Sequence, residues 1–159
     1  MLTTNSPTFH RTIDSGLSYF QAIQATVLTT GTYSFKSDSL LDAYGYLYEN
    51  NFNPSNPRAN LLTEDDDSGG DHQFLMSYPM QYGSEYILVF TTHNPRMTGT
   101  FSILTSDPSK VNLKYLHIMP VSSSPAITCI GFSVMANVVI LLMGIIIMII
   151  SGQDRHIFL

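Results

Sequence analysis

Carboxylates are the most concentrated reactive groups in this 159-residue chain, and they gather in the stretch LLTEDDDSGGDHQF at residues 61–74. Carboxylates this close together repel one another unless water, backbone N–H groups or a cation separates their charges. Calcium takes about six to eight oxygen ligands, several of them anionic. The stretch therefore predicts either a calcium site or a solvated turn. Its acidic members are Glu64, Asp65, Asp66, Asp67 and Asp71.

The calcium interpretation does not use an EF-hand. In a calcium loop of that type starting at Asp65, the final position is Met76, where a bidentate glutamate must stand. A site at the edge of a β-sandwich remains, because the strand from Asp42 to Glu49 could pair with the segment before the acidic loop. The ligands expected for such a calcium site are Asp42, Asp65, Asp66, Asp67 and Asp71.

The alternative is a turn without a metal ion. Aspartate side chains cap backbone N–H groups of their own turn, and Gly69 and Gly70 supply the positive φ angles that such a turn needs. This interpretation treats the charges as solvated. The sequence leaves both alternatives open.

Three tyrosines alternate along the segment AYGYLY, residues 43–48. In an extended strand Tyr44, Tyr46 and Tyr48 share one face and Leu47 lies on the other. Such a row is either a core or cross-strand ladder, or an exposed aromatic platform that binds sugars or peptides. We name the three tyrosines as candidate ligand-binding residues on the second interpretation.

Catalytic signals are weak. No nucleophile elbow, zinc-protease, phosphate-loop or dinucleotide motif is present in the sequence. Asp42 and Glu49 are an odd number of residues apart on a strand, which places them on opposite faces and opposes an acid–base pair. We expect no enzymatic activity. The five histidines are scattered, as is typical of loops and interfaces, at His10, His72, His93, His117 and His156.

Short alternating strands separated by Gly, Pro, Asn and Asp turns predict a mainly β fold, a small antiparallel β-sandwich. The segment YILVF (86–90) is apolar on both faces, as a central strand would be. Residues 111–118 are either a last strand or a linker. The other expected strands lie at residues 19–27, 32–36, 43–48, 73–78, 85–92 and 99–105.

An uncharged, strongly apolar run occupies residues 126–150. As a helix its 25 residues would extend roughly 37 Å, enough to cross a hydrocarbon core of about 30 Å. We therefore predict one transmembrane helix there, in contact with the lipid bilayer. Around it we expect a flexible N-terminal segment (1–16), the β domain (17–118), a stalk (119–125) and a short tail (151–159).

The charge balance excludes some partners. The net charge is −5 and no Lys/Arg cluster exists, so we expect no nucleic-acid binding. Cys129 is the single cysteine and cannot form an internal disulfide or a zinc cluster. Lys110 and Lys114 on one side of the apolar run, against Arg155 on the other, weakly favour a cytoplasmic β domain.

Several strand-and-turn motifs follow one another in a familiar order between about residues 17 and 106. Together they resemble the bacterial pre-peptidase C-terminal (PPC-like) module and its divergent relatives in large secreted animal proteins. The matching pieces are Asp42 before the tyrosine strand, Leu62 before the loop 65–70, Gly83 with Tyr86, and Gly99 with Phe101 and Ser102.

This resemblance implies a small jelly-roll-like sandwich attached beside catalytic or adhesive domains, where it binds matrix or polysaccharide or acts as a spacer. Some relatives carry calcium at a sandwich edge. It implies an extracellular β domain, although secreted modules usually lack the apolar segment. We therefore expect a non-catalytic cell-surface module for adhesion, carbohydrate or protein binding, or spacing. The alternatives are a tail-anchored interaction protein facing the cytosol and an accessory fragment of a larger surface hydrolase.

Overall fold

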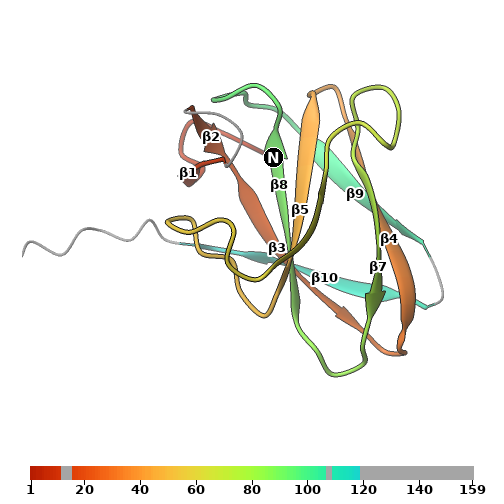
Figure 1. The fold of residues 1–159 in the computed structure, drawn as a ribbon. Coiled ribbons are helices and arrows are strands. Elements are labelled where there is room, and N and C mark those ends of the chain that lie inside the picture. The colour runs from red at the N-terminus through yellow and green to blue at the C-terminus, as the bar shows by residue number, and fades with distance from the viewer. Residues whose placement is uncertain (12–15, 107–108, 119–159) are drawn as a thin grey trace, which may run out of the picture. The chain divides into compact units, whose positions relative to one another are not determined.

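The computed structural model of this chain describes residues 1–11, 16–106 and 109–118, and in them ten β-strands form three antiparallel sheets (Figure 1). One sheet has the order β10-β3-β8-β5-β6, a second has the order β7-β4-β9, and the third is the pair β1-β2. The prediction of a mainly β, antiparallel fold is confirmed. The strands are β1 (Thr8–His10), β2 (Leu17–Tyr19), β3 (Gln21–Val27), β4 (Gly31–Ser39), β5 (Ala43–Glu49), β6 (Leu61–Asp65), β7 (Leu75–Met80), β8 (Tyr86–Thr92), β9 (Phe101–Ser106) and β10 (Val111–Leu116).

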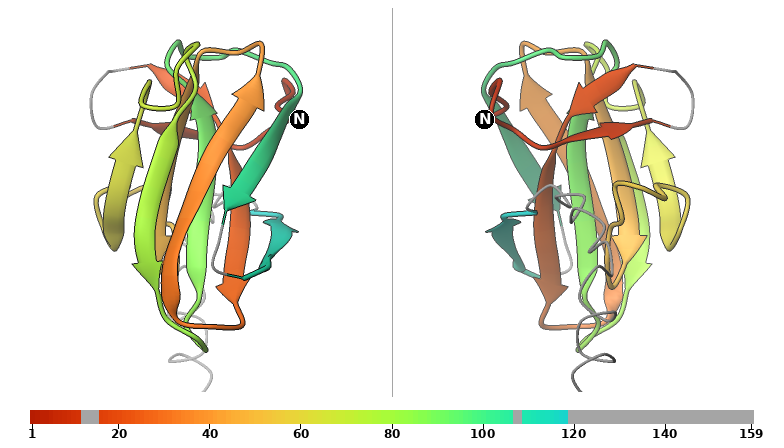
Figure 2. Two further views of the ribbon diagram at one scale, coloured as in Figure 1. Left: turned by 90° about the vertical axis from the view of Figure 1, so that its right-hand side faces the viewer. Right: turned by 90° about the vertical axis from the view of Figure 1, so that its left-hand side faces the viewer.

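The main core lies between the five-stranded and three-stranded sheets, an arrangement consistent with a β-sandwich (Figure 2). This core forms because buried and more exposed side chains alternate along the strands. Tyr33 and Phe35 of β4 are fully buried, whereas Thr32 between the turn and Tyr33 is exposed. From the facing sheet, Leu47 of β5 and Leu88 of β8 enter the same core.

A second apolar cluster covers the other face of the five-stranded sheet. Phe9, Phe20 and Phe52 pack there against the tyrosines of β5 and against Val89 of β8. As a result every residue of β8 is buried, as the apolar pattern of YILVF predicts for a central strand. The β1-β2 pair crosses this face of the sheet in Figure 2.

The N-terminal residues correct one prediction. We expected residues 1–16 to be flexible, but residues 1–11 belong to the β domain. Leu2 is 1% exposed and exchanges two backbone hydrogen bonds with Gly99, and Phe9 is 2% exposed. Burial of these apolar side chains holds the segment in place. Residues 12–15 lie outside the described part of the chain.

Residues 111–116 form a strand that pairs with β3, which decides between the strand and linker interpretations. The expected stalk, membrane helix and tail at 119–125, 126–150 and 151–159 all fall outside the described residues. Within 1–11, 16–106 and 109–118, no helix has the length and apolar character needed to cross a bilayer.

Candidate functional site

Three loops that pass from one sheet to the other meet at one end of the β domain. Residues 40–42 join β4 to β5, residues 66–74 join β6 to β7, and residues 93–100 join β8 to β9. Backbone hydrogen bonds fasten them together: Ala43 N donates to His72 O at 2.9 Å, and His93 N donates to Asp42 O at 2.8 Å. Asp42 is therefore held between the two loops that carry these histidines.

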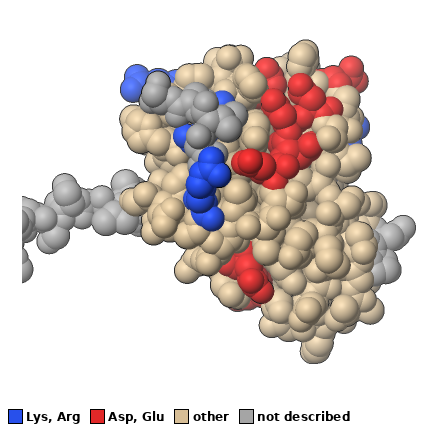
Figure 3. All heavy atoms as spheres, in the orientation of Figure 1, with Lys and Arg blue, Asp and Glu red and all other residues tan. Residues whose placement is uncertain are grey.

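Side chains with metal-ligating atoms converge at this point, which we call the Asp/His corner: Asp42, Asp66, Asp67, His72 and His93. Asp42, Asp67 and His72 form one triad whose ligand atoms all lie within 4.8 Å of one another. Asp42, Asp66 and His93 form a second triad by the same measure. Figure 3 shows a large group of acidic side chains on one part of the visible face, with a smaller, separate group elsewhere on it.

Each imidazole in the Asp/His corner faces a carboxylate. Nδ1 of His93 lies 2.9 Å from Oδ2 of Asp66, a hydrogen-bond distance. Nδ1 of His72 lies 3.7 Å from Oδ1 of Asp67, a longer contact between two well-exposed side chains. Such surface contacts contribute little to stability by themselves.

Asp65 has a different role from its acidic neighbours. Its Oδ2 accepts hydrogen bonds from the backbone N–H groups of Ser68 (3.1 Å) and Leu75 (2.8 Å), and its Oδ1 accepts from the Ser68 hydroxyl (2.6 Å). This is the capping that the metal-free turn interpretation describes, and it fixes the start of the loop. Asp71 belongs to neither triad. Of the five calcium ligands expected from sequence, the structure places Asp66 near Asp42 in one triad and Asp67 near Asp42 in the other.

The two glycines of the turn serve two different needs. Gly70 has a φ of 74°, as expected, and open space surrounds the position of a Cβ atom. Gly69 is needed for close approach instead, because a Cβ atom there would lie 2.7 Å from the carbonyl oxygen of Gln73. The expectation that both glycines supply positive φ is therefore correct for Gly70 alone.

Gln73 joins two of the three loops. Its side chain is buried, and its Nε2 donates to the carbonyl oxygens of Leu41 and His72, each at 2.9 Å. A buried amide that satisfies its hydrogen bonds in this way rigidifies the backbone around it. Gln73 is therefore a positioning residue for Asp42 and His72.

The tyrosine row lies in the core rather than on the surface. Tyr44 is 8% exposed and Tyr46 and Tyr48 are fully buried. Phe9 and Phe52 pack against these rings, and the Tyr48 hydroxyl donates to Pro57 O at 2.9 Å. This placement matches the core-ladder interpretation and leaves no open platform for sugars or peptides at these three residues.

Burial also changes the acidity of these phenols. It raises the pKa of Tyr44 to about 12, and the nearby carboxylates of Glu64 and Asp66 act in the same direction. The guanidinium of Arg11, 5.1 Å from the centre of the Tyr44 ring, partly opposes them. Burial raises the pKa of Tyr48 even further. Both rings therefore stay neutral in the folded domain well above physiological pH.

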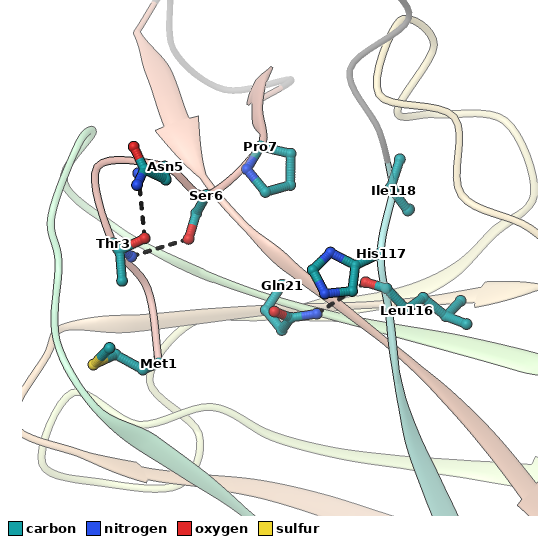
Figure 4. Close-up of a pocket in the computed structure, with 9 residues that line it drawn as sticks. All are labelled: Met1, Thr3, Asn5, Ser6, Pro7, Gln21, Leu116, His117 and Ile118. Atoms are coloured by element: carbon teal, nitrogen blue, oxygen red, sulfur yellow. Dashed lines mark hydrogen bonds between the residues drawn. The ribbon is translucent and has the colours of Figure 1, made fainter.

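A hollow of about 270 Å³ lies away from the Asp/His corner, between the N-terminal segment and the end of β10 (Figure 4). In it Gln21 Nε2 donates to the carbonyl oxygen of Leu116 at 3.1 Å, and Thr3 N donates to the Ser6 hydroxyl at 2.9 Å. The imidazole of His117 also lines the hollow. These groups can hydrogen-bond a small polar molecule but do not assemble an acid–base pair.

Sequence reasoning missed His72 and His93. They are 21 residues apart in the sequence, and their scattered positions are typical of loop and interface histidines. The signal that points to them is their position in the fold. His93 directly follows β8 and His72 lies in the acidic loop after β6, and both of these strands flank β5, which Asp42 precedes.

Comparison of the chain with models of protein families, with curated proteins and with solved structures finds no match in any of the three.

Proposed function

We propose that this protein is a non-catalytic β-sandwich module displayed at the cell surface on a transmembrane segment at residues 126–150, where it serves adhesion, carbohydrate or protein binding, or spacing. One observation carries the proposal. The apolar cores of the β domain are built from residues between Leu2 and Ile118, and an uncharged run long enough to span a bilayer follows in the sequence. A domain with its own cores can stand in water beside such an anchor.

The loop end that carries the Asp/His corner is the proposed binding end. Leu40 is fully exposed there on the loop before β5, and Met97 is 45% exposed on the loop after β8. Exposed apolar side chains beside charged groups are common in binding surfaces. The proposal includes the resemblance to PPC-like, jelly-roll-like modules, which rests on the sequence motifs and implies partners of the matrix or polysaccharide kind.

A second candidate orientation has its own support. Lys110 and Lys114 lie on the β-domain side of the apolar run, and the positive-inside tendency then favours a domain that faces the cytosol. In that case the module recruits an intracellular partner. We prefer the extracellular orientation because the sequence motifs resemble those of secreted modules, and because folded domains translocate largely regardless of a few charges.

Membrane anchoring is tested by alkaline carbonate extraction of cells that express the full chain. The wild type is expected to stay in the membrane pellet. Val138→Arg, at the middle of the apolar run, is expected to release part of the protein, because an arginine at a helix centre costs about 2.5–3.5 kcal/mol of insertion free energy. Val121→Arg, outside the run, is the matched control. Complete extraction of the wild-type protein would contradict the anchor.

Orientation is tested with an epitope and a site-specific protease cleavage site placed ahead of Met1. If the β domain faces outward, protease added to intact cells removes the epitope from anchored protein. If the epitope survives in intact cells and is removed after permeabilisation, the domain faces the cytosol and the second orientation replaces the first.

A further inference from the structure

The ligand atoms of the Asp/His corner are of two chemical kinds. Each triad combines two carboxylates with one imidazole, and the two triads share Asp42. Imidazole nitrogen suits zinc, copper, nickel and iron, whereas calcium takes an all-oxygen shell of about six to eight ligands. Asp65, one of the calcium ligands expected from the sequence, accepts hydrogen bonds with both of its carboxylate oxygens. The corner therefore offers imidazole nitrogens together with carboxylate oxygens, whereas an all-carboxylate loop would offer oxygens alone.

The geometry is set by the backbone rather than by chance contact of mobile side chains. The hydrogen bonds Ala43 N to His72 O and His93 N to Asp42 O place all three loops against one another. The side-chain amide of Gln73 donates hydrogen bonds to the Leu41 and His72 carbonyl oxygens and so joins two of these loops. Ligands around one zinc ion stand at most about 4.2 Å apart, twice a metal–ligand bond of about 2.1 Å. Within each triad the ligand atoms lie within 4.8 Å of one another, so small side-chain rotations bring the three atoms of one triad to that value.

A buried oxygen in the corner lacks a partner. Oδ1 of Asp66 is inaccessible to solvent and has no hydrogen-bond partner, although Oδ2 of the same carboxylate contacts His93. Leaving a buried carboxylate oxygen unsatisfied is costly. A cation bound between Asp42 and Asp66 would supply the missing interaction.

We propose that Asp42, Asp66, Asp67, His72 and His93 bind a divalent transition-metal ion of the zinc class. Asp42 is the shared ligand, and each histidine adds one nitrogen together with one further aspartate. The bound ion links the three crossover loops and stabilises the folded domain, because it binds the folded chain and not the unfolded one. The site is independent of whether the domain faces the outside or the cytosol.

The test uses the full-length, untagged chain in detergent, stripped with a chelator and then given Zn²⁺, Co²⁺, Ca²⁺ or Mg²⁺ separately. Isothermal titration calorimetry measures binding, and far-UV circular dichroism measures Tm. Zn²⁺ at about 100 times its Kd is expected to raise Tm by about 10 °C. Ca²⁺ is expected to leave Tm unchanged. Visible absorption of the Co²⁺ form is expected to report nitrogen ligation.

Single variants His72→Ala and His93→Ala are each expected to weaken Zn²⁺ binding at least about tenfold, and the double variant to abolish it. Both histidines are exposed, so the variants should unfold at the wild-type Tm without metal. His117→Ala, another exposed histidine, is the control and should bind like the wild type. Stabilisation by Ca²⁺ alone, no binding of any ion, or Zn²⁺ binding that survives the double variant would each overturn the proposal.

Discussion

At Gly69 the chain turns back so closely that the glycine N–H donates to Gln73 O at 2.8 Å, and the same carbonyl oxygen lies 2.7 Å from the position that a Cβ atom would take. Its neighbour Gly70 instead adopts a left-handed backbone with free space around it. The first position is limited by contact and the second by conformation, and the two limits respond differently to substitution.

Gly69→Ala is expected to lower the free energy of unfolding by about 1–3 kcal/mol, because a backbone carbonyl cannot move aside as a flexible side chain can. Gly70→Asn is the matched control and should cost about 0.5 kcal/mol or less, since asparagine tolerates left-handed backbone. Denaturant unfolding of the full chain in detergent measures both. Equal losses for the two variants would mean that the close approach of Gly69 to Gln73 is absent in solution.

At this scale the sequence predicts part of the site. The acidic character of the loop follows from its residue types. The position of Asp42 near that loop follows from the pairing of the strand after Asp42 with the strand before the loop. The sequence does not predict that His72 and His93, rather than Asp65 and Asp71, lie beside Asp42. That outcome depends on which carboxylate caps the turn and on the position of β8 beside β5. Both are consequences of the folded backbone.

The five-stranded sheet is buried on both faces, which sets the role of the short N-terminal strands. Phe9 in β1 makes edge-to-face contacts with Phe20, Tyr46 and Phe52, with ring centres 5.4–5.9 Å apart. Aromatic pairs in this geometry contribute beyond the area that they bury. The pair β1-β2 and the loop around Phe52 thus act as a cover for the outer face of β5 and β8.

Phe9→Ala is expected to lower the free energy of unfolding by about 3–5 kcal/mol, the usual cost of deleting a buried aromatic ring. His10→Ala, at the exposed next position of the same strand, should change it by less than about 0.5 kcal/mol. Thermal unfolding monitored by far-UV circular dichroism compares the two. If Phe9→Ala behaved like His10→Ala, the N-terminal segment would not cover the sheet in solution.

Strands with a long alternating or doubly apolar pattern could be predicted from the sequence, and β4, β5 and β8 are examples. The strands β1 and β2 could not, because three residues are too few to show a period of two. Neither could the second core. It requires knowing that residues 9 and 52 fold over the same face as the tyrosines, and this information is carried by tertiary contacts alone.

For the molecule as a whole, two buried phenols make stability depend on alkaline pH. The pKa of Tyr44 is raised to about 12 and that of Tyr48 is raised further, both chiefly by burial. Above pH 10 the unfolded chain loses these protons while the folded chain keeps them. The stability that is fully present below about pH 10 is therefore lost as the pH rises toward the folded-state values.

The free energy of unfolding is expected to fall by about 1.4 kcal/mol per pH unit for each such tyrosine between pH 10 and 12. Denaturant unfolding at pH 9, 10 and 11 measures the slope. Tyr44→Phe should reduce it, whereas Tyr82→Phe, at a ring that is 68% exposed, serves as the control. A slope that Tyr44→Phe leaves unchanged would place the titrating groups elsewhere.

The three loops that meet at the Asp/His corner each connect a strand of one main sheet to a strand of the other. At this end of the domain the two sheets are therefore joined by chain connections and by hydrogen bonds between the loops. A tensile force on the domain would favour sliding of one sheet relative to the other. A metal ion coordinated by residues of all three loops would resist this shear. In single-molecule force spectroscopy, the force needed to unfold the domain is therefore expected to be higher with Zn²⁺ than without it.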